Sequence, residues 1–559
     1  MKAMRGLDAM FEIFKDEGIR YVFGNPGTTE LPFMDGLVNH PELNYVLGLQ
    51  EATAMAMADG YGRASGKLSV TNFHVAPGLG NAMGAIYNAK FFGSPVIVTA
   101  GQREHGLGIT EPTLHGPLVE MAQPVTKWSV EIERTEDVPL VFRRAAKVAL
   151  TPPTGPVFVS LPADVLLGSA ELELGAPTRT LANTRPADED VARLADRLLA
   201  AQNPVLVSAH EVYTEAAFAE VAQVAELLGA AVYSQTVPSL ALFPTDHPLY
   251  LGELGKAALP VRRMLEPFDL VFMVGGDGLK TNTFLPGGPL PTGMPVLQIS
   301  RHPWELGKNF PVEMALLAGT KLTLQALIPV LRARRSEAQA QAAARRTEAT
   351  RTKNWSVRRE ELFAKAEQTA GDKPIKADYL MMQLSKELPE DAVVVEEALT
   401  STRNLLKMLP AKHHQRFFGL ASGGIGWGLA GAIGVKLALP ERPVVAVIGD
   451  GSSMYSNQAL WTAAHLKLPV TFVICNNKAY SILKERVIAQ PNSASLANEK
   501  IIGMDFKDPE LDFPALARGM GVPGHTITDP ADIVPALRQA LAADGPTLLD
   551  VHVHDGYRG

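Results

Sequence analysis

The sequence predicts an α/β protein made of three doubly wound domains, each with a parallel sheet covered by helices. Strand-like apolar runs alternate with helical stretches along almost the whole chain, which is typical of parallel sheets. At 559 residues the chain is too long for one hydrophobic core, and three domains is the natural expectation. An acidic glycine turn, Gly449-Asp450-Gly451, follows one apolar run, at the edge where such sheets bind ligands.

The alternation divides the chain into five segments. We expect an N-terminal domain (1–167), a linker rich in Pro, Thr and Ala (168–188), a central domain (189–332), a connector (333–374) and a C-terminal domain (375–559). The expected strands of the first two domains are 21–23, 68–70, 95–98, 157–159, 204–207, 231–233, 270–274 and 295–298. An Arg- and Ala-rich run enters the connector, and we interpret it as a solvated helix, with a nucleic-acid-binding arm as the alternative. The first and third domains could be structurally related.

The composition excludes several classes of protein. Apolar residues make up 46% of the chain and charged residues 20%, which is ordinary for a globular protein, and the net charge of −7 argues against a nucleic-acid surface. The single cysteine, Cys475, cannot form an intrachain disulfide, and no apolar run is long enough to span a membrane. The N-terminus has the pattern of an amphipathic helix and not of a signal peptide. We therefore expect a cytoplasmic protein with no membrane or nucleic-acid partner.

Two polar motifs follow neighbouring strands of the predicted third domain. Asp450 follows the apolar run 444–448, and Asn476-Asn477 follows the run 470–474, with a helical stretch at 459–467 between them. Parallel strands joined by a helix would place Asp450 and Asn477 at adjacent carboxyl ends of one sheet. One carboxylate and one amide oxygen cannot satisfy a hard dication alone, but they suit Mg²⁺ that takes further oxygens from a diphosphate and water.

This spacing resembles the signature of thiamin diphosphate enzymes, a GDG turn followed by an Asn pair. The resemblance implies that Asp450 and Asn477 bind Mg²⁺ and that the backbone carbonyl of Ala479 is a third ligand. The alternative interpretation is an ordinary loop between a strand and a helix.

Motifs in the first domain make the resemblance more specific. The segments FGNPGTTE (23–30), LQEA (49–52), NFH (72–74) and PGLGNAMG (77–84) resemble the benzoylformate decarboxylase branch of these enzymes. Pyruvate decarboxylases, pyruvate oxidases and acetohydroxyacid synthases are similar but more distant. In this family the cofactor bridges two subunits, so the resemblance implies a homodimer, commonly assembled further into a homotetramer.

The resemblance identifies Glu51 as the acid that activates the cofactor, because a carboxylate against the aminopyrimidine ring lets that ring act as a base. Alternatively, Glu51 is a first-turn acid that favours a helix dipole. The remaining cofactor contacts implied by the resemblance are Thr400, Ser401, Gly423, Ile425, Gly449, Gly451, Ser452, Tyr480, Ser481 and Ile482. Ile425 would lie between the two cofactor rings and the Gly423 carbonyl would receive the exocyclic amine, although a glycine-rich helix start is the alternative. Leu399 replaces a Thr of one relative, so a diphosphate contact is expected to be missing.

Two residues match groups that handle substrate in the family. His74 matches a catalytic His, and Thr28 stands where relatives have a Ser that binds the substrate carboxylate. The alternatives are a structural His and a helix-capping Thr. The second catalytic His of the family falls on Asn282, which cannot shuttle a proton near neutral pH. His115 is a candidate substitute, and an exposed loop His is the alternative.

The predicted substrate wall also departs from the family. Two Phe residues of relatives correspond to Gly419 and Arg486, and a small Ala corresponds to Ile482. Losing both aromatic faces removes stacking for a phenyl ring, and Ile482 with Leu483 would form an apolar wall. Arg486 would favour a polar or acidic substrate tail, unless it is a solvated helix residue paired with a nearby acid. Benzoylformate itself is therefore not expected to be the best substrate.

The sequence leaves three hypotheses for function. The first is a thiamin diphosphate- and Mg²⁺-dependent decarboxylase of 2-oxo acids that releases an aldehyde and CO₂, with carboligation as a side activity. The second is a carboligase of the acetolactate synthase type, favoured by the missing second His, with FAD in the central domain left open. The third is a non-catalytic scaffold on the same fold, which the intact acid and metal motifs disfavour.

Overall fold

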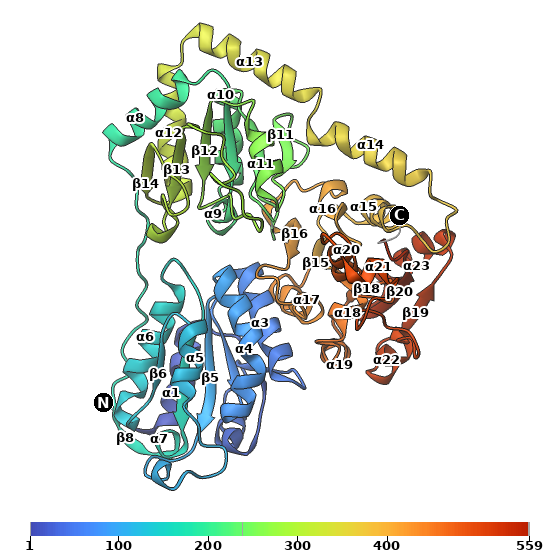
Figure 1. The fold of residues 1–559 in the computed structure, drawn as a ribbon. Coiled ribbons are helices and arrows are strands. Elements are labelled where there is room, and N and C mark those ends of the chain that lie inside the picture. The colour runs from blue at the N-terminus through green and yellow to red at the C-terminus, as the bar shows by residue number, and fades with distance from the viewer. Residues whose placement is uncertain (1, 238, 557–559) are drawn as a thin grey trace.

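The computed structural model describes residues 2–237 and 239–556, and within them three parallel six-stranded sheets form three α/β domains (Figure 1). The predicted fold class is confirmed. The domain boundaries given above remain predictions, because the sheets locate the strands and not the limits of independent folding units.

The first domain contains a sheet in the order β3-β2-β4-β5-β7-β6, with every pair parallel. Its strands are β2 (Tyr21–Asn25), β3 (Asn44–Leu47), β4 (Ser69–Phe73), β5 (Val96–Gln102), β6 (Ser129–Glu131) and β7 (Val157–Pro162). Its helices are α1 (Gly6–Asp16), α2 (Leu31–Leu37), α3 (Glu51–Ser65), α4 (Val75–Phe92), α5 (Leu118–Ala122), α6 (Val138–Leu150) and α7 (Ala163–Leu167). The four strands predicted here are confirmed, and the short edge strand β6 was missed.

The N-terminus differs from the predicted helix in its first residues. The amphipathic pattern is confirmed from Gly6 onward, but β1 (Lys2–Arg5) pairs antiparallel with β8 (Ser169–Leu172). The partner β8 lies inside the segment predicted to be a linker. This pairing joins residues about 167 positions apart, so no local pattern could indicate it.

The central domain has a different sheet order, β11-β10-β9-β12-β13-β14, again with all pairs parallel. Its strands are β9 (Pro204–Ser208), β10 (Ala231–Ser234), β11 (Tyr250–Glu253), β12 (Leu270–Val274), β13 (Val296–Ser300) and β14 (Met314–Leu317). Its helices are α8 (Asp188–Ala200), α9 (His210–Thr214), α10 (Phe218–Leu228), α11 (Ala258–Leu265) and α12 (Thr320–Arg334). The four strands predicted for this domain are confirmed.

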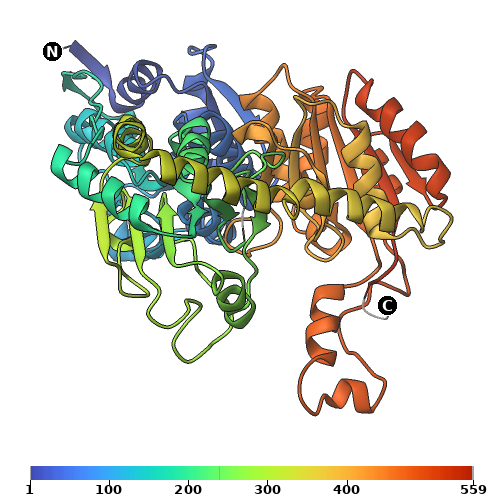
Figure 2. The ribbon, with the colours of Figure 1, turned by 90° about the horizontal axis from the view of Figure 1, so that it is seen from above.

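Two helices, α13 (Glu337–Arg351) and α14 (Trp355–Glu367), connect the central and third domains. They run in succession along one side of the molecule, where the yellow helices cross the view in Figure 2. Most of α13 is exposed or half-buried, which agrees with a solvated connector. Helix α14 is anchored by Trp355, whose indole Nε1 donates a hydrogen bond to the Lys407 carbonyl at 2.9 Å.

The third domain has the sheet order β16-β15-β17-β18-β20-β19, all parallel. Its strands are β15 (Val393–Glu397), β16 (Phe417–Gly419), β17 (Val444–Gly449), β18 (Val470–Asn476), β19 (Gly524–Ile527) and β20 (Thr547–His552). Its helices are α15 (Ala377–Glu387), α16 (Leu405–Met408), α17 (Gly428–Ala438), α18 (Asp450–Ser453), α19 (Ala459–His465), α20 (Ser481–Ile488), α21 (Ala494–Ala497), α22 (Phe513–Gly519) and α23 (Ile533–Leu541). The segment with α20 and α21 projects from this domain (Figure 2).

The first and third domains pack on each other through α3 and α17. The two helices touch backbone to backbone: a Cβ on Gly60 would lie 2.2 Å from the Gly431 carbonyl oxygen, and one on Gly434 would lie 2.0 Å from that of Met57. Glycine is required for this close approach. Because α3 begins at Glu51 and α17 follows the glycine-rich loop 423–426, the contact fixes two of the predicted site segments relative to each other.

Within the described part of the chain, every helix is too short or too polar to cross a bilayer.

Candidate active site

The two polar motifs of the third domain meet as predicted. Strands β17 and β18 are parallel neighbours with Gly449 opposite Cys475, so Asp450 and Asn477 leave the sheet side by side. The Asp450 Oδ2 accepts a hydrogen bond from the Asn477 backbone N–H at 3.0 Å, and its Oδ1 accepts one from Gly451 N–H at 2.7 Å. The Asn477 Oδ1 accepts from Ala479 N–H at 3.0 Å. Burial raises the pKa of the Asp450 carboxyl to about 6.

A glycine-rich loop and an acid beneath it lie at the start of α17. Gly423 and Gly426 both have left-handed backbone conformations, with φ of +87° and +102°, which side chains rarely adopt. The Glu397 carboxylate accepts hydrogen bonds from the backbone N–H groups of Gly426 and Gly428, and so holds the loop against the sheet. Burial raises the pKa of Glu397 to about 8. Ile425, in the middle of this loop, is half-buried.

In the first domain, Glu51 is the first residue of α3 and is buried. Its Oε1 accepts a hydrogen bond from Asn25 Nδ2 at 3.2 Å, and its Oε2 accepts one from Asn81 Nδ2 at 3.1 Å. A Cβ on Gly78 would stand 3.1 Å from Oε1, so this glycine leaves room for the carboxylate. Two amides from different elements therefore fix the orientation of one buried acid.

His74 lies at the start of α4 and is oriented by a buried glutamate. Its Nδ1 is 2.9 Å from Glu30 Oε2 and 3.3 Å from Thr29 Oγ1. Glu30 is itself held by the backbone N–H groups of Gly27 and Gly101, at 2.9 and 3.1 Å. The imidazole packs against Gly27, where a Cβ would overlap it at 2.0 Å from Nδ1. This arrangement fixes Nδ1 and leaves Nε2 as the ring nitrogen that can exchange a proton with a ligand.

Unusual backbone conformations occur beside four of the predicted motifs. Leu49, Val75, Leu399 and Lys478 all have positive φ, at 55°, 39°, 23° and 59°. Leu49 lies two residues before Glu51, and the other three directly adjoin His74, the 400–401 segment and Asn477, respectively. Non-glycine residues in this region are strained, and such strain clusters at functional sites.

The other predicted residues of the first two domains are more exposed. Thr28 begins a short 3₁₀ turn (Thr28–Glu30) and is exposed. His115 is exposed in the loop before α5, but its neighbour Gly116 lies against α4, because a Cβ there would be 2.8 Å from Ala76 Cβ. Asn282 is exposed on an open depression of about 600 Å³ formed by residues 281–285 with Ala258, Gly287 and Gly288.

Helix α20 carries the predicted pocket residues Ile482, Leu483 and Arg486. Ile482 is half-buried, whereas Leu483 and Arg486 are exposed. The neighbouring Glu485 pairs with Arg403 and not with Arg486. Among the described residues no acid pairs with Arg486, so its guanidinium is available to a ligand or a second subunit.

Comparison with known proteins identifies the family. The chain matches the models for the N-terminal TPP binding domain (residues 4–112), the central domain (191–327) and the C-terminal TPP binding domain (400–551) of thiamine pyrophosphate enzymes. Benzoylformate decarboxylase of Pseudomonas aeruginosa is 33% identical over 549 residues, which cover 97% of this chain and 98% of that protein. This chain is a thiamine pyrophosphate enzyme.

Further relatives of this thiamine pyrophosphate enzyme include both decarboxylases and synthases. The structure of the 4-hydroxybenzoylformate decarboxylase of Rhodococcus jostii RHA1 superposes with a TM-score of 0.85 at 32% identity and covers 99% of each chain. The large subunit of acetolactate synthase isozyme 3 of Escherichia coli is 27% identical over 557 residues, which cover 97% of this chain and 93% of that protein.

The residues around Asp450 fit a diphosphate and a metal. The described residues contain no group of three or more His, Cys, Asp or Glu side chains that could hold an ion, so a dication here needs ligands from the backbone and the cofactor. The Ser481 hydroxyl, at the start of α20, is buried without a hydrogen-bond partner in the described structure. Gly451 faces the Tyr480 ring so closely that a Cβ would lie 2.4 Å from it. An unsatisfied hydroxyl and a close-packed turn suit a phosphate group held next to Asp450.

Several residues that orient the predicted groups had no assigned role in the sequence interpretation. They are Asn25 and Asn81 for Glu51, Glu30 for His74, and Glu397 for the loop 423–426. Each lies within or beside a motif noted in the sequence, but only the folded chain brings the partners together. For Glu397 the sequence does contain a signal: two Glu residues end the otherwise apolar strand β15, and acids at the end of a buried strand indicate a structural or functional role.

Proposed function

We propose that this enzyme is a thiamin diphosphate- and Mg²⁺-dependent decarboxylase of 2-oxo acids, which releases an aldehyde and CO₂ and forms carbon–carbon bonds as a side activity. One observation carries the proposal. The chain carries a buried Glu51 fixed by two amides in the first domain and an Asp450–Asn477 pair in the third, which supports a cofactor site with these two halves.

The third domain would hold the cofactor by its diphosphate. Asp450, Asn477 and the Ala479 carbonyl are the proposed metal ligands, and Gly449, Gly451, Ser452, Thr400 and Ser401 the proposed contacts around it. Ser401 and Ser452 are both buried, which supports a role in a shielded phosphate site. Tyr480, Ser481 and Ile482 continue the site into α20. Leu399 offers no hydroxyl, so Thr400 is the first side chain of its segment that can donate to phosphate.

The first domain would supply the acid and the proton donor. Glu51 would donate a proton or a hydrogen bond to a ring nitrogen of the cofactor, and the hydrogen bonds from Asn25 and Asn81 that orient its carboxylate support this role. When bound, the cofactor supplies the electron sink into which the bond to the leaving carboxylate breaks. The Gly423 carbonyl and the Ile425 side chain would set the orientation of its rings.

His74 is the proposed proton carrier for the substrate. Glu30 holds its Nδ1, so a proton on Nε2 can be delivered to the reacting carbon or its oxygen. Thr28 is the proposed hydrogen-bond donor to the substrate carboxylate. His115, in the loop next to Ala76, is the second candidate for proton transfer in place of Asn282.

The substrate is proposed to be a 2-oxo acid with a polar distal end. One solved relative acts on 4-hydroxybenzoylformate and one curated relative on benzoylformate. The resemblance implies that Gly419 and Arg486 correspond to Phe residues of a relative, a change that would remove aromatic stacking and add a cation. We therefore propose that benzoylformate itself is not the best substrate.

We propose a homodimer that pairs further into a homotetramer. Tyr87 and Phe91 on α4 are about half exposed, and so is Tyr455 next to α18. Exposed aromatic side chains on both the first and the third domain are expected if a second copy of the chain covers them.

A panel of 2-oxo acids tests the proposal. The purified enzyme, supplied with thiamin diphosphate and Mg²⁺, is assayed for CO₂ release from aliphatic, aromatic and dicarboxylic 2-oxo acids. We expect CO₂ and the matching aldehyde from at least one class. No CO₂ from any member, with bound cofactor verified by calorimetry, would refute a decarboxylase.

A carboligase of the acetolactate synthase type is the second candidate, and Asn282 in place of a proton-transferring His is the observation that favours it. Product analysis with pyruvate and an aldehyde acceptor separates the two functions, because acyloin and not free aldehyde would then dominate.

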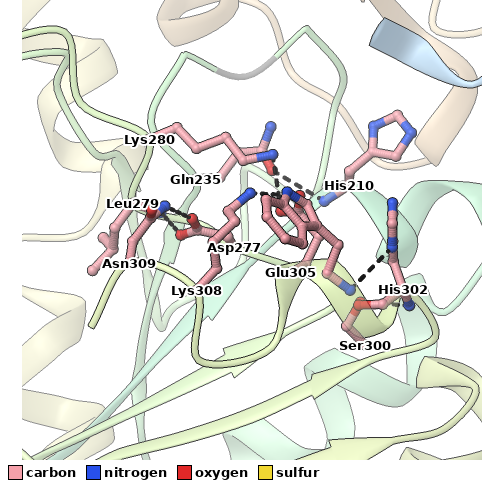
Figure 3. A network of polar contacts seen from close by, with 12 residues as sticks. His210, Gln235, Asp277, Leu279, Lys280, Ser300, His302, Glu305, Lys308 and Asn309 are labelled. Carbon is pink, nitrogen blue, oxygen red and sulfur yellow. Dashed lines mark hydrogen bonds and ion pairs between the residues drawn. The ribbon is translucent and has the colours of Figure 1, made fainter. Parts of the chain in front are cut away.

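Side-chain contacts in the central domain support an enzyme that does not bind FAD. Ligands of open α/β sheets bind beyond the carboxyl ends of the strands, and there side chains already pair with one another (Figure 3). Glu305 forms ion pairs with Lys280 at 2.9 Å and with Lys308 at 2.8 Å, and Asp277 accepts a hydrogen bond from Asn309. These contacts use the polar groups at the carboxyl edge of the central sheet for one another, which supports our proposal that the enzyme works without FAD.

A further inference from the structure

Strand β15 ends in two glutamates with different surroundings. Both carboxylate oxygens of Glu397 accept backbone hydrogen bonds from the loop before α17. Glu396 uses only one oxygen: its Oε1 accepts from Ala398 N–H at 2.9 Å and from the Thr402 hydroxyl. Among the described residues, no donor reaches Glu396 Oε2.

The space beside this free oxygen is the side-chain position of Gly419. Glu396 and Gly419 are register partners on β15 and β16, and a Cβ on Gly419 would lie 3.4 Å from Oε2. Gly419 is not among the residues with positive φ, so the backbone does not require glycine there. The missing side chain therefore leaves a narrow gap between the Glu396 carboxylate and the Phe417 ring, which lies 3.1 Å from the same Cβ position, and Glu396 is half-buried.

Segments of the proposed active site converge on Glu396. Thr402 follows the Thr400–Ser401 segment proposed to contact the diphosphate. Lys256, whose charge acts on the Glu396 carboxyl, also accepts a hydrogen bond through its backbone carbonyl from Asn282 N–H at 2.8 Å. Gly419 is fixed from the first domain, because Arg63 Nη1 donates to its carbonyl at 3.0 Å. The free oxygen thus lies beside Gly419, which is proposed to line the substrate wall.

The Glu396 carboxylate favours a substrate that donates a hydrogen bond. An ionised carboxylate accepts hydrogen bonds only, and an enclosed one is costly to leave unpaired. Desolvation raises the pKa of the Glu396 carboxyl, and a hydrogen bond donated to Oε2 would favour its ionised form. Lys256 already balances part of the negative charge, so a neutral donor suits the site better than an ammonium group.

We propose that Glu396 is a specificity-determining residue, which accepts a hydrogen bond from a hydroxyl group at the distal end of the 2-oxo acid, in the space left by Gly419. This inference rests on the proposed function and deepens it, since it assigns the substrate class of the same site.

Matched substrate pairs test the assignment. The holoenzyme is assayed with 4-hydroxybenzoylformate against benzoylformate, and with 5-hydroxy-2-oxopentanoate against 2-oxohexanoate. The readout is the ratio of kcat/KM between the hydroxylated and the unhydroxylated member. A hydrogen bond to a charged acceptor predicts a ratio of about 10 to 100 in at least one pair.

The variant Glu396→Gln should reduce that ratio to about 1 or below. The amide oxygen can still accept from Ala398 and Thr402, while the amide nitrogen puts a donor where the free acceptor was. The control Glu390→Gln changes an exposed glutamate on the surface, paired with Lys412, and should keep the wild-type ratio. Thermal unfolding of both variants checks that they fold.

If Glu396→Gln does not fold, Gly419→Ala serves instead. Its methyl group narrows the gap between Oε2 and the Phe417 ring and should lower kcat/KM for the hydroxylated members more than for their partners. Ratios that stay at the wild-type value in the folded variant would overturn the role of Glu396 and leave decarboxylation intact. If no 2-oxo acid of any class is turned over by the wild type, both the proposed function and this inference fail.

Discussion

The first and third domains have the same strand order and carry different chemistry. Counted from the first strand of each sheet, both read 2-1-3-4-6-5, whereas the central sheet reads 3-2-1-4-5-6. In the first sheet the third strand, β4, is followed directly by His74, and in the third sheet the third strand, β17, is followed directly by Asp450. Equivalent places on the two sheets thus hold the proposed proton carrier and the proposed metal ligand.

The two domains also contact each other through equivalent helices. Helix α3 follows the second strand of the first sheet and α17 follows the second strand of the third, so the helices that pack together are equivalents. The lesson is that one topology, used twice, supplies two different halves of a site. The fold sets where the residues lie, and the side chains at the strand ends decide what each half does.

The largest expected effect on activity comes from Glu51→Gln, which removes the acid in the first-domain half of the proposed site. Loss of the acid should lower kcat by roughly a thousandfold, since positioned acids and bases contribute about 10² to 10⁴. Steady-state kinetics at saturating cofactor measure it, and Mg²⁺ binding should be retained, because the metal residues lie in the other domain. An unchanged rate would refute the assignment, and Glu12→Gln on the surface of α1 is the matched control.

The reciprocal experiment breaks the third-domain half with Asp450→Ala. Thiamin diphosphate and Mg²⁺ at 100 times their Kd should stabilise the wild type by about 2.7 kcal/mol and the variant far less. The thermal midpoint with and without the pair of ligands, and after EDTA, reports the difference. Asp544→Ala, at an exposed loop position, should respond as the wild type does. An equal shift in both variants would show that Asp450 does not hold the metal.

A smaller effect is expected from Glu30→Gln, which keeps the His74 side chain and weakens the hydrogen bond that orients its imidazole ring. We expect a drop of roughly tenfold to a hundredfold in kcat/KM, less than for His74→Ala, because the imidazole remains but its orientation is less fixed. Thermal unfolding checks that the buried substitution leaves the fold intact. If the two variants lose the same activity, or Glu30→Gln loses none, Glu30 does not act through His74.

The smallest effect concerns the pH dependence of stability in the third domain. The pKa of Glu397 is raised from its ordinary value of 4.5 to about 8 by burial, so the folded protein holds a proton that the unfolded chain releases. This contribution to stability is fully present below about pH 4.5 and is lost as the pH rises to about 8, at up to about 1.4 kcal/mol per pH unit.

Replacing Glu397 by Gln removes that slope. The difference in thermal midpoint, wild type minus Glu397→Gln, should therefore grow as the pH is lowered from 8 to 5. Asp450 is present in both proteins, so its contribution to the pH dependence cancels in the difference between the two thermal midpoints. A difference that is constant with pH, or that shrinks on acidification, would contradict a protonated Glu397 in the folded state.

Much of the proposed site could be predicted from the sequence because its signals are local. The strand before Asp450, the strand before Asn477 and the helix start at Glu51 each follow from a few consecutive residues. The roles given to Thr28, His115, Asn282 and Arg486 remain predictions. Short strands at sheet edges, such as β6 and β16, escaped prediction because three residues carry too little periodicity.

The sequence by itself determined the parallel α/β domains, the placement of Asp450 beside Asn477 and the family. Only the tertiary structure decided that Asn25 and Asn81 donate hydrogen bonds to Glu51 and that Glu30 orients the His74 ring. It also decided that one carboxylate oxygen of Glu396 lies next to Gly419 without a hydrogen-bond donor among the described residues. The physical reason is the range of the interactions. Periodicity and turn motifs act over a few neighbouring residues, whereas these hydrogen bonds join segments that become neighbours only when helices and sheets pack.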